Sequence, residues 1–173
     1  SFLDASTVGD IDLGHLAALG KLESYPVTAP DELIERLQHA NIAITNKVVI
    51  DEAALQQSPH LKLICIAATG TNCVDLDAAK AAGVTVCNVA GYSTASVTQH
   101  TLGLLINLAT GMNRYAGELS QWAQSPIFTR LDYPMIDLAG KTLGIVGLGT
   151  IGKSVARAAQ GLGMNVVALS RDG

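Results

Sequence analysis

The sequence predicts an α/β protein in which the strands of a parallel β-sheet alternate with helices. Its composition suits strands covered on both faces, because 49% of the 173 residues are apolar, 15% are charged and 4% are aromatic. Short β-rich runs alternate with amphipathic stretches at the spacing of βαβ units. A glycine-rich turn between an expected strand and an expected helix, GLGTIG at residues 147–152, is a third indication of this class.

Strands and helices alternate through the first ninety residues. The expected strands are β-rich or continuously apolar, the third of them fully buried, and cover residues 1–6, 41–46, 61–68 and 84–89. The expected helices have apolar stripes or acidic first turns and cover residues 30–40, 51–58 and 74–83. Gly83 ends the last of these helices. Asp75 and Asp77 resemble a general acid–base pair, but their position at a helix start favours capping of free amides.

The pattern changes after residue 90. Residues 92–119 predict a long helical region, and residues 120–140, which contain two prolines, predict a connector. A second strand–helix–strand unit follows, beginning with a buried strand, over residues 141–147, 150–163 and 164–170. We therefore expect two domains, residues 1–96 and 97–173.

The glycine turn has the setting that a dinucleotide site requires. Gly147 allows the tight turn, Gly149 allows a pyrophosphate to approach the backbone, and Gly152 allows the helix and strand to pack closely. The free amides at the start of the following helix, together with its dipole, favour bound phosphate. The alternative is a glycine-rich turn that binds no ligand. The sequence favours the first part of a Rossmann domain.

The end of the second strand in this unit bears on the choice of coenzyme. An NAD site commonly places an acidic residue here against the ribose hydroxyls, whereas this chain has Ser170 followed by Arg171. A hydroxyl and a guanidinium favour a 2′-phosphate, so we expect NAD(P) with a preference for NADP. In the alternative, Asp172 turns back to bind the ribose of NAD.

Composition and motifs argue against several other classes of protein. The net charge is −4 without a basic stripe, so we expect no nucleic acid partner. No apolar run approaches a membrane span, and no signal peptide is evident. The four histidines lack metal-ligand spacing, so we expect no metal. Three cysteines without a C-x-x-C pair are expected to be reduced core residues, which indicates the cytoplasm: Cys65, Cys73 and Cys87.

Long motifs, present in order, resemble the D-isomer-specific 2-hydroxyacid dehydrogenase family. They include ATGTNCVDLDAAKAAGVTVCNVAGYSTASVTQHTLGLLI at residues 68–106 and LAGKTLGIVGLGTIGKSVARAAQGLGM at residues 138–164. Within the family, the chain is most similar to the glycerate dehydrogenases and hydroxypyruvate reductases. The resemblance implies a flavodoxin-like substrate domain, a Rossmann domain and a homodimer built around the long helix and connector. It implies hydride transfer between NAD(P)H and a small 2-keto acid, converting hydroxypyruvate or glyoxylate to D-glycerate or glycolate.

The resemblance also implies roles for individual residues. For the substrate, it assigns the carboxylate to backbone amides of the turn Ala68–Thr69–Gly70 and places Asn46 beside the substrate. The turn follows an expected buried strand, where successive free amides form an anion-binding nest. For the coenzyme, it assigns Val97 to the nicotinamide and the amides of Thr150 and Ile151 to the pyrophosphate.

Other conspicuous residues are expected to be structural. His100 matches a histidine of the hinge helix in the family rather than its catalytic histidine. Trp122 and Phe128 resemble a base-stacking platform, but without a basic patch we expect packing or a subunit contact.

The family's catalytic arginine, glutamate and histidine have no counterpart in this chain and are expected beyond residue 173. We therefore expect the chain to be a fragment of the N-terminal half, inactive by itself. The alternative is a non-catalytic NAD(P)-binding sensor or a co-repressor-like interaction module.

Overall fold

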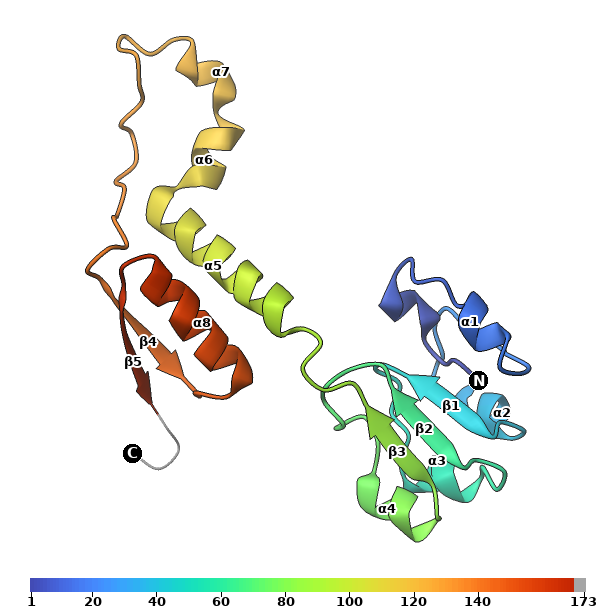
Figure 1. Cartoon of the computed structure of the whole chain (residues 1–173). Coiled ribbons are helices and arrows are strands. Elements are labelled where there is room, and N and C mark those ends of the chain that lie inside the picture. The colour runs from blue at the N-terminus through green and yellow to red at the C-terminus, as the bar shows by residue number, and fades with distance from the viewer. Residues whose placement is uncertain (170–173) are drawn as a thin grey trace. The chain divides into compact units, whose positions relative to one another are not determined.

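The computed structural model describes residues 1–169, and the chain divides into two compact units, one of Ser1–Ala90 and one from Gly91 onward (Figure 1). Both units combine helices with parallel strands, so the predicted α/β class is confirmed. Ser170 and Arg171, which the sequence predicts to bind the coenzyme, lie outside the described residues. The assignment of a substrate domain and a coenzyme domain stays a prediction.

The first unit contains a three-stranded parallel sheet in the order β1-β2-β3 (Figure 1). Its strands are β1 (Ile42–Thr45), β2 (Leu63–Ile66) and β3 (Thr85–Asn88). Its helices are the 3₁₀ helix η1 (Ala5–Val8), α1 (Gly14–Ala17), α2 (Leu33–Leu37), α3 (Glu52–Gln56) and α4 (Leu76–Ala81). The order of elements from residue 30 to residue 89 follows the sequence prediction, although each is shorter than predicted.

The predicted strand at residues 1–6 is wrong as a full strand. Phe2 forms isolated bridges to Ser24 and Ile44, and Leu3 donates a hydrogen bond to Ile44, but beyond Leu3 the segment bonds to the carbonyls of Tyr25 and Pro26 instead of β1. The chain turns into η1 because the amide and hydroxyl of Thr7 both bind the carbonyl of Asp4. The segment therefore lies against β1 for only a few residues.

One face of this sheet carries the core. Ala43 and Ile64 have no exposed surface and Ile66 is 1% exposed, and they pack in a cluster with helix residues that include Leu37. The alternate residues of the same strands are half-buried or exposed, because successive side chains of a strand point to opposite faces. The strand predicted at residues 61–68, which is β2, is therefore buried on one face only, and its predicted full burial is wrong.

The three cysteines are free thiols in different environments. Cys73 is buried, Cys65 is half-buried and Cys87 is exposed, so the predicted core position of Cys87 is wrong. Cys65 and Cys87 are register partners in β2 and β3, on the less covered face of the sheet. Burial raises the pKa of the Cys65 and Cys73 thiols, which keeps both protonated at neutral pH.

The second unit begins with α5 (Thr94–Thr110), which the sequence predicts as part of one helical region to residue 119. Gly111 ends this helix in the left-handed conformation, with φ of 64°, and the chain continues as α6 (Met112–Gly117) and α7 (Leu119–Trp122). A strand–helix–strand motif follows an extended connector: β4 (Thr142–Val146), α8 (Thr150–Gly161) and β5 (Asn165–Leu169). Helices α5 and α8 pack together (Figure 1).

Strands β4 and β5 pair in parallel and are covered by α8 through the buried residues Val155 and Ala159. The side chains on the other face are open, with Val146 85% exposed. The prediction of a buried strand is therefore wrong for β4 in this structure. Helix α8 covers only one face of the sheet that β4 and β5 form.

Candidate functional site

The glycine turn joins β4 to α8 and has strict steric requirements. Gly147 has φ of 92°, a conformation that side chains of L-residues rarely adopt. A Cβ added to Gly152 would lie 2.2 Å from the carbonyl oxygen of Gly147 and 3.4 Å from Cγ2 of Ile145. Helix α8 therefore starts against β4 at a distance that only glycine permits.

Gly149 differs from these two glycines. It is the N-cap of α8 with extended backbone, and an added Cβ would meet no protein atom within 4 Å. Nothing inside the described fold explains a glycine at this position. A ligand that approaches the backbone closely would explain it.

The first amides of α8 are available to an anion. The N–H groups of Thr150 and Ile151 precede the first backbone bond of the helix, which runs from Lys153 to the carbonyl of Gly149. Both residues are exposed. Over the twelve residues of α8, the helix dipole adds partial positive charge at this end.

The other two coenzyme predictions are less constrained by the structure. Val97 lies in the first turn of α5 with 39% of its surface exposed, where a ligand can reach it. Strand β5 ends at Leu169, whose carbonyl accepts a hydrogen bond from the amide of Gly147. Ser170 and Arg171, which carry the NADP prediction, lie outside the described residues. His100 is exposed on α5.

In the first unit, the predicted substrate turn lies directly after β2. The amide of Ala67 still pairs with the carbonyl of Thr45, but the exposed amides of Thr69 and Gly70 bind no acceptor within residues 1–169. An added Cβ on Gly70 would lie 3.0 Å from the side-chain oxygen of Asn72. The turn therefore presents free N–H groups at the carboxyl edge of a parallel sheet, which is where such sheets bind ligands.

Residues at the end of β3 hold this turn. The side-chain amide of Asn88 donates to the carbonyl of Thr69 at 2.7 Å, and the hydroxyl of Thr69 donates to the carbonyl of Val89 at 3.0 Å. Sequence reasoning missed Asn88, because its partner lies nineteen positions away.

Asn46 follows β1 at the same edge of the sheet. Thr45 and Ile66 are register partners, so Asn46 and the turn Ala68–Thr69–Gly70 follow neighbouring strands in the same direction. Asn46 is half-buried, and its side chain makes no hydrogen bond within the described chain. Its backbone amide binds the buried carboxylate of Asp4, which sequence reasoning did not select.

Several predicted structural roles agree with the geometry. The carboxylate of Asp75 accepts a hydrogen bond from the amide of Ala78 at 2.9 Å, so it caps α4 as expected, and Asp77 lies in the first turn. Gly83 follows α4 with φ of 72°.

Among the described residues, no three histidine, cysteine or acidic side chains group to hold a metal ion. None of the helices in residues 1–169 could span a membrane.

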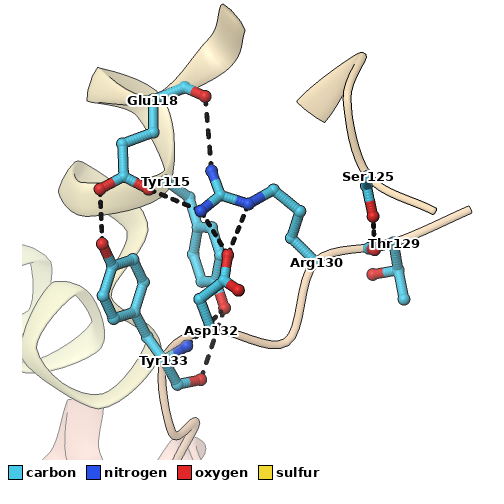
Figure 2. A network of polar contacts seen from close by, with 7 residues as sticks. All are labelled: Tyr115, Glu118, Ser125, Thr129, Arg130, Asp132 and Tyr133. Atoms are coloured by element: carbon cyan, nitrogen blue, oxygen red, sulfur yellow. Dashed lines mark hydrogen bonds and ion pairs between the residues drawn. The ribbon is translucent and has the colours of Figure 1, made fainter. Parts of the chain in front are cut away.

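A polar network joins α6 and Glu118, the residue between α6 and α7, to the connector (Figure 2). Arg130 is paired with Glu118 at 2.8 Å and also with Asp132, and the hydroxyl of Tyr133 donates to Glu118 at 2.5 Å (Figure 2). Tyr115 packs edge-on against Tyr133 with ring centroids 5.1 Å apart. The bond from Tyr133, supported by Arg130, lowers the pKa of Glu118, and the same bond raises the pKa of Tyr133.

The two aromatic residues selected from the connector behave differently. Trp122 packs against Tyr115 with a centroid distance of 5.7 Å, which agrees with a packing role. Phe128 is fully exposed and is covered by none of the described residues.

Comparison with known proteins identifies the family. The family model described as D-isomer specific 2-hydroxyacid dehydrogenase, catalytic domain, matches residues 5–170. The chain belongs to this dehydrogenase family. The family resemblance predicted from the sequence motifs is therefore confirmed.

Individual family members support the assignment. The chain is 48% identical to the glycerate dehydrogenase of Methylorubrum extorquens, over 80% of this chain and 45% of that protein. It is 36% identical to the hydroxypyruvate reductase of Blautia hydrogenotrophica, over 92% of this chain and 51% of that protein. The crystal structure of Aquifex aeolicus D-lactate dehydrogenase with NAD and lactic acid matches with a TM-score of 0.77 and 26% identity, covering 99% of this chain and 52% of that one. The chain thus spans about half the length of the relatives it matches.

Proposed function

We propose that the protein containing this chain is an NAD(P)-dependent D-2-hydroxyacid dehydrogenase. Its substrate is a small 2-keto acid, hydroxypyruvate or glyoxylate, which it converts to D-glycerate or glycolate. The observation that carries the proposal is the βαβ glycine turn, in which a Cβ added to Gly152 would lie 2.2 Å from the carbonyl oxygen of Gly147 and Gly149 is unexplained without a ligand. Family membership supports the same reaction.

The glycine turn after β4 binds the coenzyme, and the turn after β2 binds the substrate. At the glycine turn, the amides of Thr150 and Ile151 bind the coenzyme pyrophosphate at the positive end of α8. At the turn after β2, the free amides of Thr69 and Gly70 bind the substrate carboxylate, and the unpaired side chain of Asn46 faces the substrate. The bound coenzyme supplies or accepts the hydride.

Proton transfer and polarisation of the ketone need further groups. Reduction requires a cation to polarise the 2-keto acid, an acid to protonate the developing alkoxide and a partner to adjust the pKa of that acid. The family resemblance assigns these tasks to an arginine, a histidine and a glutamate without counterparts among the 173 residues. We therefore propose that these residues lie in another segment and that the 173 residues alone are inactive.

Three finer points belong to the proposal. Ser170 and Arg171 favour NADP through contacts with its 2′-phosphate. Phe128 is exposed on the connector, which the ion pair of Arg130 with Glu118 holds in place, and this supports a homodimer formed through the long helix and connector. Sedimentation of the whole protein checks the dimer. The cysteine usage supports a cytoplasmic location.

The test measures the loss of NAD(P)H absorbance when the whole protein is mixed with hydroxypyruvate, glyoxylate, pyruvate or a bulkier 2-keto acid. We expect turnover with hydroxypyruvate or glyoxylate. An absence of turnover with every 2-keto acid, in protein that still binds NAD(P)H, would replace this proposal with the non-catalytic sensor. The 173-residue chain is assayed in parallel, and turnover by that chain would contradict its predicted inactivity.

A further inference from the structure

A buried carboxylate holds the loop that follows β1. Asp4 is 4% exposed, and both of its oxygens accept from the amide of Asn46, at 2.9 and 3.1 Å. The Oδ2 atom also accepts from the amide of Lys47 at 2.6 Å and from that of Val48 at 3.3 Å. Three successive amides therefore converge on one side chain more than forty residues earlier in the chain.

Asp4 is the main constraint on the start of this loop. Val48 has a second acceptor in the hydroxyl of Thr45 at 3.0 Å, but the amides of Asn46 and Lys47 bind only Asp4 within residues 1–169. Lys47 is exposed, so packing of its side chain does not hold this part of the loop, whereas Val48 packs against the core. A hollow of about 630 Å³ lies beside Asp4, Lys47 and Val48.

The position of the loop decides where the Asn46 side chain lies. Asn46 is the first residue after β1, and its side chain has no hydrogen-bond partner in the described chain to fix its direction. Its backbone is fixed by the two bonds to Asp4. Loss of Asp4 would leave two buried or half-buried amides without an acceptor, and the loop would rearrange to expose them to water.

We propose that Asp4 is a positioning residue of the substrate site, which acts by fixing the backbone from which Asn46 reaches the 2-keto acid. The inference rests on the proposed function in one respect only, namely that Asn46 contacts the substrate. Asp4 itself touches neither substrate nor coenzyme. Because the carboxylate acts through Asn46, its effect on turnover depends on the presence of that side chain.

The first experiment is a double-mutant cycle in the whole protein with Asp4→Asn, Asn46→Ala and the double variant. Asp4→Asn keeps the side-chain shape but replaces one acceptor oxygen with a donor. We expect it to lower kcat/KM for the keto acid about tenfold and to leave KM for NAD(P)H within about twofold. In the Asn46→Ala background the same change is expected to have an effect under about twofold. Equal effects of Asp4→Asn in the two backgrounds would overturn the proposal.

Ser58→Ala is the matched control for lost stability. Ser58 is 3% exposed, and its hydroxyl binds the carbonyl of Ala54 at the far end of α3 from Asp51, its N-cap. We expect the control to lower Tm while kcat/KM for the keto acid stays unchanged. A loss of kcat/KM in Ser58→Ala that matches the loss in Asp4→Asn would show that Asp4 acts only through stability, and would overturn its positioning role.

Amide hydrogen exchange in the wild-type whole protein tests the same contact without any assay of activity. We expect the amides of Asn46 and Lys47 to be protected like that of Ile44, which bonds to the carbonyl of Ser1. Exchange of both at the rate of an open loop would overturn the proposal even if Asp4→Asn fails to fold. Protected amides together with an inactive wild-type protein would place the failure in the proposed function rather than in the Asp4 contact.

Discussion

The two units each present free backbone amides after a parallel strand, but they hold those amides in different ways. At the glycine turn, the constraint is local. Gly147 and Gly152 are five residues apart, and the carbonyl oxygen of Gly147 occupies the place that a Cβ of residue 152 would need. In the first unit, Asn88 holds the substrate turn from nineteen positions away, and Asp4 holds the neighbouring loop at Asn46 from more than forty positions away. A site held by local sterics is visible in a motif, whereas a site held by distant hydrogen bonds is visible only in the fold.

The difference predicts that the glycine turn tolerates change least. Gly152→Ala would place a methyl group 2.2 Å from a backbone oxygen, so α8 must move away from β4. We expect a loss of unfolding free energy of about 3 kcal/mol and a loss of coenzyme affinity of about 100-fold. Thermal unfolding and NADPH titration of the whole protein measure the two effects. Unchanged stability would contradict the close packing.

The coenzyme preference is the next largest expected effect. Arg171→Ala removes the guanidinium proposed to bind the 2′-phosphate, so we expect NADPH affinity to fall about tenfold while NADH affinity changes less than about twofold. Parallel titrations with the two coenzymes measure the ratio. Equal losses for NADPH and NADH would overturn the NADP preference, and Asp172→Ala tests the alternative in which that carboxylate binds the ribose of NAD.

A smaller effect is expected where the substrate turn is held by a distant side chain. Asn88→Ala removes the 2.7 Å bond to the carbonyl of Thr69, and we expect KM for the keto acid to rise about fivefold because one net hydrogen bond is lost. KM for the coenzyme should not change. Thr85→Ala, an exposed position at the start of the same strand, is the control. An equal rise in KM in the control would remove the assigned role of Asn88.

The smallest expected effect concerns the connector network and its pH dependence. The pKa of Glu118 is lowered from 4.5, so its contribution to stability is present above pH 4.5 and is lost as the pH falls through the lowered value. The pKa of Tyr133 is raised from 10.0, so its contribution is present below pH 10.0 and is lost as the pH rises through the raised value. We expect Glu118→Gln to lower Tm by a few degrees at neutral pH and to flatten the acid limb of the stability profile. An acid limb identical to that of the wild-type protein would contradict the pairing.

The elements that the sequence predicted correctly are those with local signals. The glycine turn, the cap at Asp75 and the stop at Gly83 each depend on neighbours within a few residues. The class of fold follows from the alternation of strands and helices, and the family follows from long contiguous motifs.

The elements that the sequence did not predict depend on tertiary contacts. The expected strand at residues 1–6 stops because Asp4 begins a 3₁₀ turn. Cys87 lies in an apolar run, but its strand exposes that face of the sheet. Gly111, inside a helical pattern, takes a left-handed conformation and divides the expected long helix. Asp4 itself lies directly after an apolar pair, Phe2 and Leu3, which is the one local sign that it is buried.

The central claim is that the glycine turn binds the pyrophosphate of a dinucleotide, and Gly149→Ala in the whole protein tests it most directly. An added Cβ at Gly149 meets no protein atom within 4 Å, so Tm should stay within about one degree of the wild-type value. The methyl group would occupy the space of the phosphates, so NADPH affinity should fall about 100-fold. Unchanged Tm with unchanged NADPH affinity would contradict the claim and leave the turn a structural feature without a ligand.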